Sequence, residues 1–387
     1  MLAITGGRII TMAGRIIENG TVVVQHGKIC EIGANVQIPK DADIIDVTGK
    51  VIMPGMIDAH SHLGIVEEVY REEGNDGNEY TDPVTPHLRA IDGINPADLG
   101  FRDALAGGVT TVVTGPGSDN VIGGEMVAMK TAGTVIDDMI VRFPVGLKAA
   151  LGENPKRCYG RDRKMPATRM ASAAILREAL VRGQEYIKKN TPNSGVGEVH
   201  IPERDLKMEA LARVLKRQVP LRIHAHRADD IMTAVRIARE FQVNLVIEHG
   251  TEGHIVANQL ANLGISVVIG PVITNRAKVE MQRVTLETAR VLSAAGVRIA
   301  IMTDHPVVPI QYLALSAALT VKGGLSEDAA LRAVTIDAAR ILGLENNLGS
   351  LEQGKDADFI VLDRHPLDIL CRIEQVFING VKVYSII

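Results

Sequence analysis

Both ends of the chain carry short runs in which hydrophobic and polar positions alternate. Glycine-containing turns interrupt these runs, with Asn-Gly pairs at 19–20 in the first end (residues 1–52) and at 379–380 in the second (residues 346–387). Alternation with a period of two is typical of strands with one buried face, and Asn-Gly is a strong hairpin signal. Neither end is long enough to support a core easily by itself. We therefore predict that the two ends pair in one small β-sandwich domain.

Between these ends, residues 53–345 show continuous apolar runs that alternate with amphipathic segments. The predicted strands after the first cover residues 109–114, 143–150, 220–226, 243–249, 265–271 and 297–304. The predicted helices cover about 96–106, 168–189, 205–217, 229–241, 252–263, 278–295, 309–322 and 326–342. This pattern indicates a parallel sheet covered by helices. About eight such units predict an α/β fold, a (β/α)8 TIM-like barrel. A doubly wound open sheet is disfavoured, because no glycine-rich phosphate loop follows an early strand.

A glycine-rich segment, TGPGSDNVIGG at 114–124, follows one of the predicted strands. It has neither the Lys-Ser/Thr ending of a phosphate-binding loop nor the GxGxxG spacing. We expect a strand-to-helix loop that faces the substrate. Phosphate binding and plain turn formation are the alternatives.

The composition narrows the classes of partner. A formal charge of −4 over 387 residues, without a basic block, argues against nucleic acid or an anionic membrane. We find no signal peptide and no apolar run of the roughly 18 residues that a membrane span needs. Three widely spaced cysteines fit reduced thiols better than a disulfide framework. We expect a cytoplasmic protein that acts on a small molecule, with a homo-oligomer such as a dimer as an open alternative.

Two His-x-His pairs end predicted strands, His60 with His62 and His224 with His226. Residues two apart in a strand point to the same side, as two ligands of one metal must. Chance alone gives about 0.3 such pairs in a chain with this histidine content, so two favour a metal site.

Other polar residues also end apolar strands, namely Lys148, His249 and Asp304. Taken singly, each has a plain reading: a structural histidine, a solvated lysine, or a helix N-cap at Asp304. In a (β/α)8 barrel, however, the carboxyl ends of the strands converge on one site. We therefore predict that these side chains and the histidine pairs meet there.

Two segments resemble motifs of the amidohydrolase superfamily of metal-dependent hydrolases. PGMIDAHSH at 54–62 is similar to its first-strand motif, and GSLEQGKDADFIVLD at 349–363 resembles the return of the chain into its β-sandwich. The resemblance covers nearly the whole chain. Within the superfamily, GLKAALGENPKR at 146–157 and EHGTEG at 248–253 resemble the imidazolonepropionase and prolidase-like dipeptidase branches.

The resemblance implies a pair of divalent metal ions, for which we expect Zn²⁺. It implies that His60, His62 and Asp304 hold one ion, and that His224 and His249 hold the second. Lys148 stands where binuclear members carry a lysine carboxylated by CO2, and such a carbamate would supply the anionic bridge that two close cations need. Zinc lowers the pKa of its water to about 7. Asp304 would then act as general base and afterwards as general acid.

Several assignments around this site stay open. His226 is the alternative to His224 as a ligand, and otherwise it would contact the substrate. Glu153 is a weaker candidate for the bridging carboxylate. An arginine just past a strand end could clamp a substrate carboxylate, or form an ordinary surface ion pair. The expected substrate-binding residues are His226, Arg227, Thr274, Asn275 and Arg276.

One departure from the superfamily pattern bears on the reaction. Its deaminases commonly use one metal and a glutamate shortly after the histidine of strand five, but AHRADD follows His224 here. Together with Lys148, this predicts a hydrolase that cleaves an amide-type C–N bond of a cyclic amide, an N-acyl amino acid or a dipeptide with a metal-bound hydroxide. A mononuclear deaminase or an imidazolonepropionase-type ring-opening hydrolase is the alternative. A catalytically inactive scaffold is a minor one.

Overall fold

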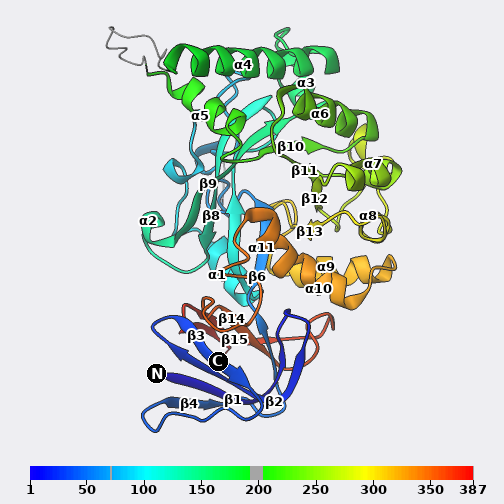
Figure 1. Cartoon of the computed structure of the whole chain (residues 1–387). Helices are drawn as coiled ribbons and strands as arrows, with labels where there is room; N and C mark the ends of the chain where they lie inside the picture. Colours follow the sequence, from blue (N-terminus) through cyan, green and yellow to red (C-terminus); the bar gives the residue numbers. More distant parts are fainter. Residues whose placement is uncertain (70–71, 192–203, 387) are drawn as a thin grey trace.

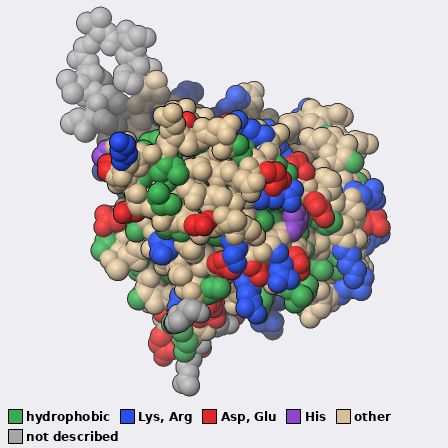
Figure 2. All heavy atoms as spheres, turned by 90° about the horizontal axis from the view of Figure 1, so that it is seen from below, with side chains coloured by type: hydrophobic (Ala, Val, Ile, Leu, Met, Phe, Trp, Pro, Cys, Tyr) green, Lys and Arg blue, Asp and Glu red, His purple; other side chains and the backbone are tan. Residues whose placement is uncertain are grey.

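The computed structural model describes residues 1–69, 72–191 and 204–386 of the chain. It has two parts, a sheet built from both chain ends and a second sheet surrounded by helices (Figure 1). Across the described residues, every helix is too short or too polar to cross a membrane. Figure 2 shows the face seen from below, on which acidic and basic side chains are intermixed.

The terminal sheet joins the two ends of the chain. Its strands are β1 (Leu2–Ile10), β2 (Ile16–Gln25), β3 (Lys28–Gly33), β4 (Asp43–Asp46), β5 (Val51–Pro54), β14 (Phe359–Leu362), β15 (Ile373–Ile378) and β16 (Val381–Ser385). They run in the order β16-β15-β14-β5-β1-β2-β3, with β4 paired to β1. The antiparallel pair of β5 and β14 connects the ends, so the predicted pairing of the two ends is present. Their description as a sandwich stays a prediction.

The two Asn-Gly pairs behave differently. Asn379 and Gly380 form the two-residue turn between β15 and β16, with φ of 50° and 73°, as predicted. The pair at Asn19 and Gly20 lies inside β2, and the hairpin predicted there is wrong. The left-handed φ of Asn19 accompanies a register shift where Gly20 faces Gly7 of β1. A bulge therefore uses the conformation that a turn would have used.

The second sheet is a nearly closed barrel of eight strands. They are β6 (Met56–Ser61), β7 (Val109–Thr114), β8 (Ile122–Lys130), β9 (Ile140–Ala150), β10 (Leu221–Ala225), β11 (Leu245–His249), β12 (Ser266–Ile269) and β13 (Ile299–Ile301). They follow one another in chain order around the sheet. Where β13 approaches β6, the N–H of His62 donates to the carbonyl of His305 at 2.8 Å.

The barrel is not fully parallel, which corrects the sequence prediction. Strand β8 is antiparallel to both β7 and β9. The glycine-rich connection at 115–121 explains the reversal, because a parallel crossover needs about a dozen residues or more. This segment is a strand-to-strand loop and not the predicted strand-to-helix loop.

Helices cover the outside of the barrel (Figure 1). They are α1 (Leu99–Ala106), α2 (Ile136–Met139), α3 (Glu153–Arg161), α4 (Arg169–Asn190), α5 (Leu206–Leu215), α6 (Ala228–Phe241), α7 (Ala257–Asn262), α8 (Thr288–Ala294), α9 (Leu313–Lys322), α10 (Glu327–Ala333) and α11 (Ile336–Leu342). The helix predicted over 278–295 is largely wrong. Only α8 and the short 3-10 turn η4 (Val279–Met281) form there, and the rest is an irregular connection after β12.

A buried ion pair fastens the barrel to the terminal sheet. Lys130, the last residue of β8, contacts the carboxylates of Asp358 and Asp356, with 3.0 Å between Lys130 Nζ and Asp356 Oδ2. The side chains of Lys130 and Asp358 are 9% and 5% exposed. Within the sheet, the rings of Phe359 and Phe377 stack at 4.5 Å.

Candidate metal centre

The first group of candidate ligands lies where β6 and β13 end. His60 and His62 point to the same side, as their spacing predicted, and Asp304 follows β13. Asp304 Oδ1 lies 3.1 Å from His60 Nε2 and 3.5 Å from His62 Nε2. One donor atom from each of the three residues lies within 4.8 Å of the others, so the group could hold a metal ion.

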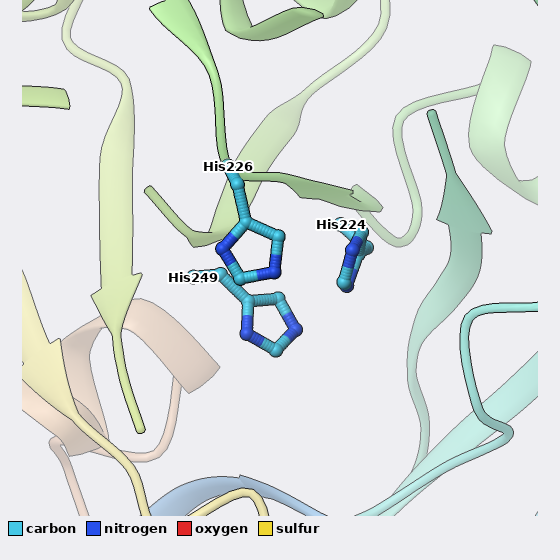
Figure 3. A group of neighbouring side chains, drawn as sticks. All are labelled: His224, His226 and His249. Carbon is cyan, nitrogen blue, oxygen red and sulfur yellow. The ribbon is translucent and has the colours of Figure 1, made fainter. Parts of the chain in front are cut away.

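The second group consists of His224 and His226 at the end of β10 and His249 at the end of β11. Their rings converge (Figure 3), with centroid distances of 4.2 Å between His224 and His249 and 4.6 Å between His226 and His249. Their donor atoms also lie within 4.8 Å of one another. The two groups adjoin, because the rings of His60 and His249 are 5.5 Å apart.

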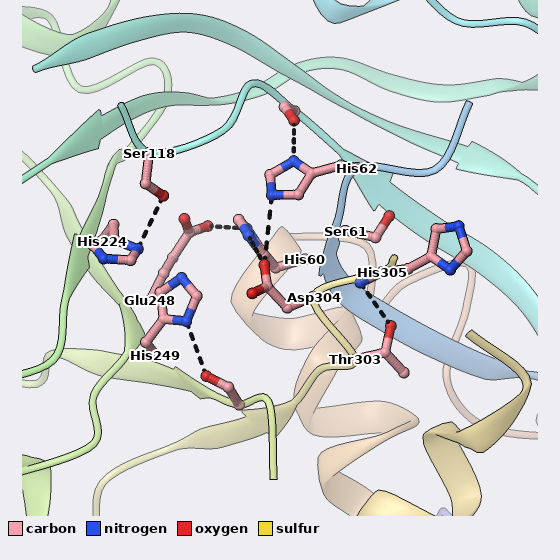
Figure 4. A network of polar contacts seen from close by, with 12 residues as sticks. His60, Ser61, His62, Ser118, His224, Glu248, His249, Thr303, Asp304 and His305 are labelled. Carbon is pink, nitrogen blue, oxygen red and sulfur yellow. Dashed lines mark hydrogen bonds and ion pairs between the residues drawn. The ribbon is translucent and has the colours of Figure 1, made fainter. Parts of the chain in front are cut away.

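Hydrogen bonds at Nδ1 orient these rings (Figure 4). His62 Nδ1 lies 2.7 Å from the carbonyl of Gly115, and His249 Nδ1 lies 2.9 Å from the carbonyl of Gly270. A carbonyl only accepts, so both Nδ1 atoms carry the proton and the Nε2 lone pairs face the site.

Hydroxyl groups hold the other two rings. His224 Nδ1 is 2.9 Å from Ser118 Oγ, and His226 Nδ1 is 2.7 Å from Thr251 Oγ1. Ser118 lies in the glycine-rich loop, which therefore faces the site. In the described part of the chain, Nε2 of His224 and Nε2 of His249 are buried without a hydrogen-bond partner. Metal-binding histidines are typically held in this way, with one nitrogen bonded and the other free for the ion.

The protonation states also suit ligands. Burial lowers the pKa of His224 and of His249 well below the usual range, and it lowers the pKa of His226 to about 4. Burial opposes ionisation of Asp304, but its interactions with His249 and His60 outweigh burial and hold its pKa well below the usual range. At neutral pH the imidazoles of His224, His226 and His249 are therefore neutral and Asp304 is ionised, which are the forms that bind metal.

Lys148 lies in a buried charge network that the sequence reasoning missed. Its Nζ is 2.6 Å from Glu248 Oε2, and Glu248 Oε1 is 2.8 Å from Arg222 Nε and 3.0 Å from His60 Nδ1. Burial alone would raise the pKa of Glu248, but the charges of His60, Lys148 and Arg222 hold it well below the usual range. The available signal was a charged residue inside each of the apolar strands LRIHA and LVIEH.

Glu248 and His249 are consecutive, yet both side chains approach His60. Alternation along a strand would send them to opposite faces. His249 has a left-handed backbone, with φ of 72°, and this breaks the alternation. Asp304 also has a positive φ, 58°. Strained backbone of this kind concentrates at functional sites.

The expected substrate-binding residues divide into three kinds. His226 belongs to the histidine group. Thr274, Asn275 and Arg276 line a cavity of about 390 Å³ that also reaches His249. Arg227 makes two hydrogen bonds with Asp229, at 2.9 and 2.8 Å, which is the ordinary ion pair that was its alternative reading.

Two further carboxylates lie beside the second group. Glu153, the candidate bridging carboxylate, begins α3, and its Oε2 accepts from the N–H of Glu280 at 3.4 Å. Glu280 is 1% exposed, and its Oε1 lies 3.7 Å from Nε2 of both His224 and His226. Glu280 was not identified as a site residue from the sequence, because it lies within the helix predicted over 278–295.

Comparisons with known proteins identify similar sequences and a similar structure. The model of the Amidohydrolase family matches residues 51–383. The amidohydrolase tasK of Hapsidospora irregularis is 31% identical over 395 residues, which cover 95% of this chain but only 40% of that protein. An imidazolonepropionase of Sphingopyxis alaskensis is 26% identical over 95% of this chain and 93% of its own length. The crystal structure of an amidohydrolase from Thermotoga maritima MSB8 is 44% identical, with a TM-score of 0.96 over the full length of both chains.

Proposed function

The chain belongs to the amidohydrolase family, and from this we propose that it is a metal-dependent hydrolase that cleaves an amide-type C–N bond in a small molecule. The observation that carries the proposal is the pair of adjoining ligand groups. In the second group, Nε2 of His224 and Nε2 of His249 are buried without a hydrogen-bond partner among the described residues. The family match and the named relatives support an enzyme acting on C–N bonds at a general level.

Two divalent ions, for which we propose Zn²⁺, fit these residues. His60, His62 and Asp304 would hold one ion, and His224 and His249 would hold the second. The unpartnered Nε2 atoms of His224 and His249 and the ionised carboxylate of Asp304 support this set. The surroundings of His60 also favour positive charge: despite burial, the carboxylates of Glu248 and Asp304 raise its pKa. Zinc, when bound, activates water near neutral pH and polarises a carbonyl.

Asp304 is the proposed proton carrier. As an ionised carboxylate, it accepts a proton from the water whose oxygen bonds to the substrate carbonyl carbon. When the C–N bond breaks, Asp304 returns that proton to the leaving nitrogen, so charge and atoms balance over the cycle. Thr274, Asn275 and Arg276 are proposed to contact the substrate from the cavity beside His249.

Lys148 is the proposed site of the carbamate that bridges the two ions. As an ammonium it pairs with Glu248, whereas carbamylation replaces its positive charge with a negative one. Carbamylation would therefore require Lys148 to leave its ion pair with Glu248. Arg222 keeps Glu248 neutralised in either state, at 2.8 Å. The observed ion pair stabilises the ammonium form of the lysine.

We propose that the two sheets correspond to two domains. Residues 53–345 form the catalytic barrel, and residues 1–52 with 346–387 form a small β-sandwich domain that closes one end of it. All three cysteines are free thiols, which suits the reducing cytoplasm.

A second candidate function is a mononuclear ring-opening hydrolase of the imidazolonepropionase type. The nearly full-length match to an imidazolonepropionase favours it, as does the pairing of Lys148 with Glu248. It predicts one ion per chain and no dependence on CO2. An inactive scaffold is disfavoured, because both ligand groups are complete.

Activity and metal content measured together test the proposal. Purified protein is assayed against N-acyl amino acids, dipeptides and cyclic amides, before and after treatment with a chelator, while elemental analysis counts the ions. We expect two ions per chain and hydrolysis that a chelator abolishes and Zn²⁺ restores. One ion per chain supports the ring-opening alternative, and hydrolysis that survives complete metal removal contradicts the proposal.

A further inference from the structure

Glu280 is a buried carboxylate with one oxygen that no hydrogen bond satisfies. It lies in η4, in the connection that follows β12, and it is 1% exposed. Among the described residues, its Oε1 has no hydrogen-bond partner, and the nearest cation, Lys278 Nζ, is 3.9 Å away. Lys278 instead donates to Asn154 Oδ1 at 2.9 Å. A buried oxygen left in this way is costly unless a cation or donor meets it.

The unpartnered oxygen faces the histidine group. Glu280 Oε1 is 3.7 Å from His224 Nε2 and 3.7 Å from His226 Nε2. Zinc bonds of about 2.0–2.2 Å in a tetrahedral site place ligand atoms about 3.4 Å apart. Both distances from Glu280 Oε1 are therefore close to the spacing of two ligands around one ion.

A hydrogen bond holds the second oxygen of the Glu280 carboxylate. Glu280 Oε2 accepts a hydrogen bond from the N–H of Glu153 at 2.9 Å. Gly152, with φ of 90°, brings this backbone close, since a Cβ at Gly152 would lie only 2.8 Å from Glu280 Oε2. The start of α3 thus holds one oxygen of Glu280 and leaves Oε1 directed at the imidazoles.

We propose that Glu280 and His226 join His224 and His249 as ligands of the ion at the second group. This inference rests on the proposed metal-dependent function and extends it. Histidines alone give that ion no negative charge, and Glu280 provides one from the loop side. Carboxylate oxygens join imidazole nitrogens in many zinc ligand sets. His226 then binds metal and is not the expected substrate contact, and the second ion has an anionic ligand that does not depend on carbamylation of Lys148.

Metal binding to chelator-treated protein tests the inference. Binding is monitored by the absorption of added Co²⁺ and by competition with Zn²⁺, and elemental analysis gives the number of bound ions. Glu280→Gln keeps the shape of the side chain and removes its charge. We expect this variant to bind one ion at least about tenfold more weakly than the wild type, with a changed Co²⁺ spectrum. Glu252→Gln is the matched control. Glu252 is also buried, but its Oε2 accepts from the N–H of Ala228, so metal binding should be unchanged.

Each outcome decides the inference. If Glu280→Gln binds the same number of ions with wild-type affinity, the inference fails while the proposed function stands. If the wild type binds no divalent ion, both fail. His226→Gln and Glu280→Asp are assayed alongside, with circular dichroism to establish folding, in case Glu280→Gln does not fold. Wild-type affinity in His226→Gln overturns the inference as well, whereas weakened binding in both variants supports it.

Discussion

Removing the charge of Glu248 tests the buried network beneath the ligand groups. Glu248 lies 2.6 Å from Lys148 Nζ and 2.8 Å from Arg222 Nε, and all three side chains are at most 1% exposed. At an effective dielectric constant of about 20, one charge pair at 4 Å is worth about 4 kcal/mol. Glu248→Gln leaves two buried cations without their counter-ion, although the amide oxygen still accepts a hydrogen bond. Breaking a buried pair in this way costs about 3–5 kcal/mol.

The assay is urea unfolding in the presence of a chelator, which separates the charge network from metal binding. Glu125→Gln is the control, because Glu125 is buried but pairs with Arg213, whose side chain is 39% exposed. We expect the control to lose about 1 kcal/mol or less, since solvent screens the arginine. A second comparison combines Glu248→Gln with Lys148→Met, which should recover part of the loss because one orphaned cation is removed. A loss below about 1 kcal/mol in Glu248→Gln would refute the reasoning.

Four other perturbations probe the site and its support. Asp304→Asn should retain most of the metal by elemental analysis and lose at least about 100-fold in kcat, because the proton carrier is gone. Lys148→Ala should lose activity and regain part of it in the presence of small carboxylic acids that replace the carbamate. Zn²⁺ at 100 times its Kd should raise the free energy of unfolding of the metal-free protein by about 2.7 kcal/mol. Asp358→Asn should lower the free energy of unfolding by about 1–3 kcal/mol without changing metal content, because Lys130 loses one of its two carboxylate partners and keeps Asp356.

Each of these four predictions would be contradicted by a specific result. Unchanged turnover in Asp304→Asn removes the proton-transfer role, and unchanged turnover in Lys148→Ala removes the lysine from the reaction. A thermal transition that does not respond to Zn²⁺ argues against an ion in the folded protein. A normal stability for Asp358→Asn shows that the contact with Lys130 does not fasten the two sheets together.

The alternation of apolar runs and helices was enough to predict most of the barrel, because each buried strand leaves a continuous hydrophobic run. It could not reveal that β8 is reversed, since a buried strand reads the same in either direction. The reversal could have been predicted from the 115–121 connection, which is too short for a parallel crossover. The two Asn-Gly pairs were equally ambiguous, because a left-handed conformation serves a bulge at Asn19 and a turn at Asn379.

The residues of the candidate site also differ in whether the sequence could predict them. His60, His62, His224, His249 and Asp304 could be found because each ends a strand whose place in the barrel is predictable. Glu248 was missed because its approach to His60 depends on how β11 lies relative to β6, which the sequence does not show. Glu280 was hidden because an irregular connection carries it to the histidines. Tertiary geometry, and not residue type, decides both positions.

The most direct test of the central claim is anomalous diffraction at the zinc absorption edge from crystals grown with Zn²⁺. The account predicts one peak among His60, His62 and Asp304 and a second beside His224, with the two ions on adjoining sides of the barrel mouth. If neither ligand group shows an anomalous peak, the proposed metal centre is contradicted.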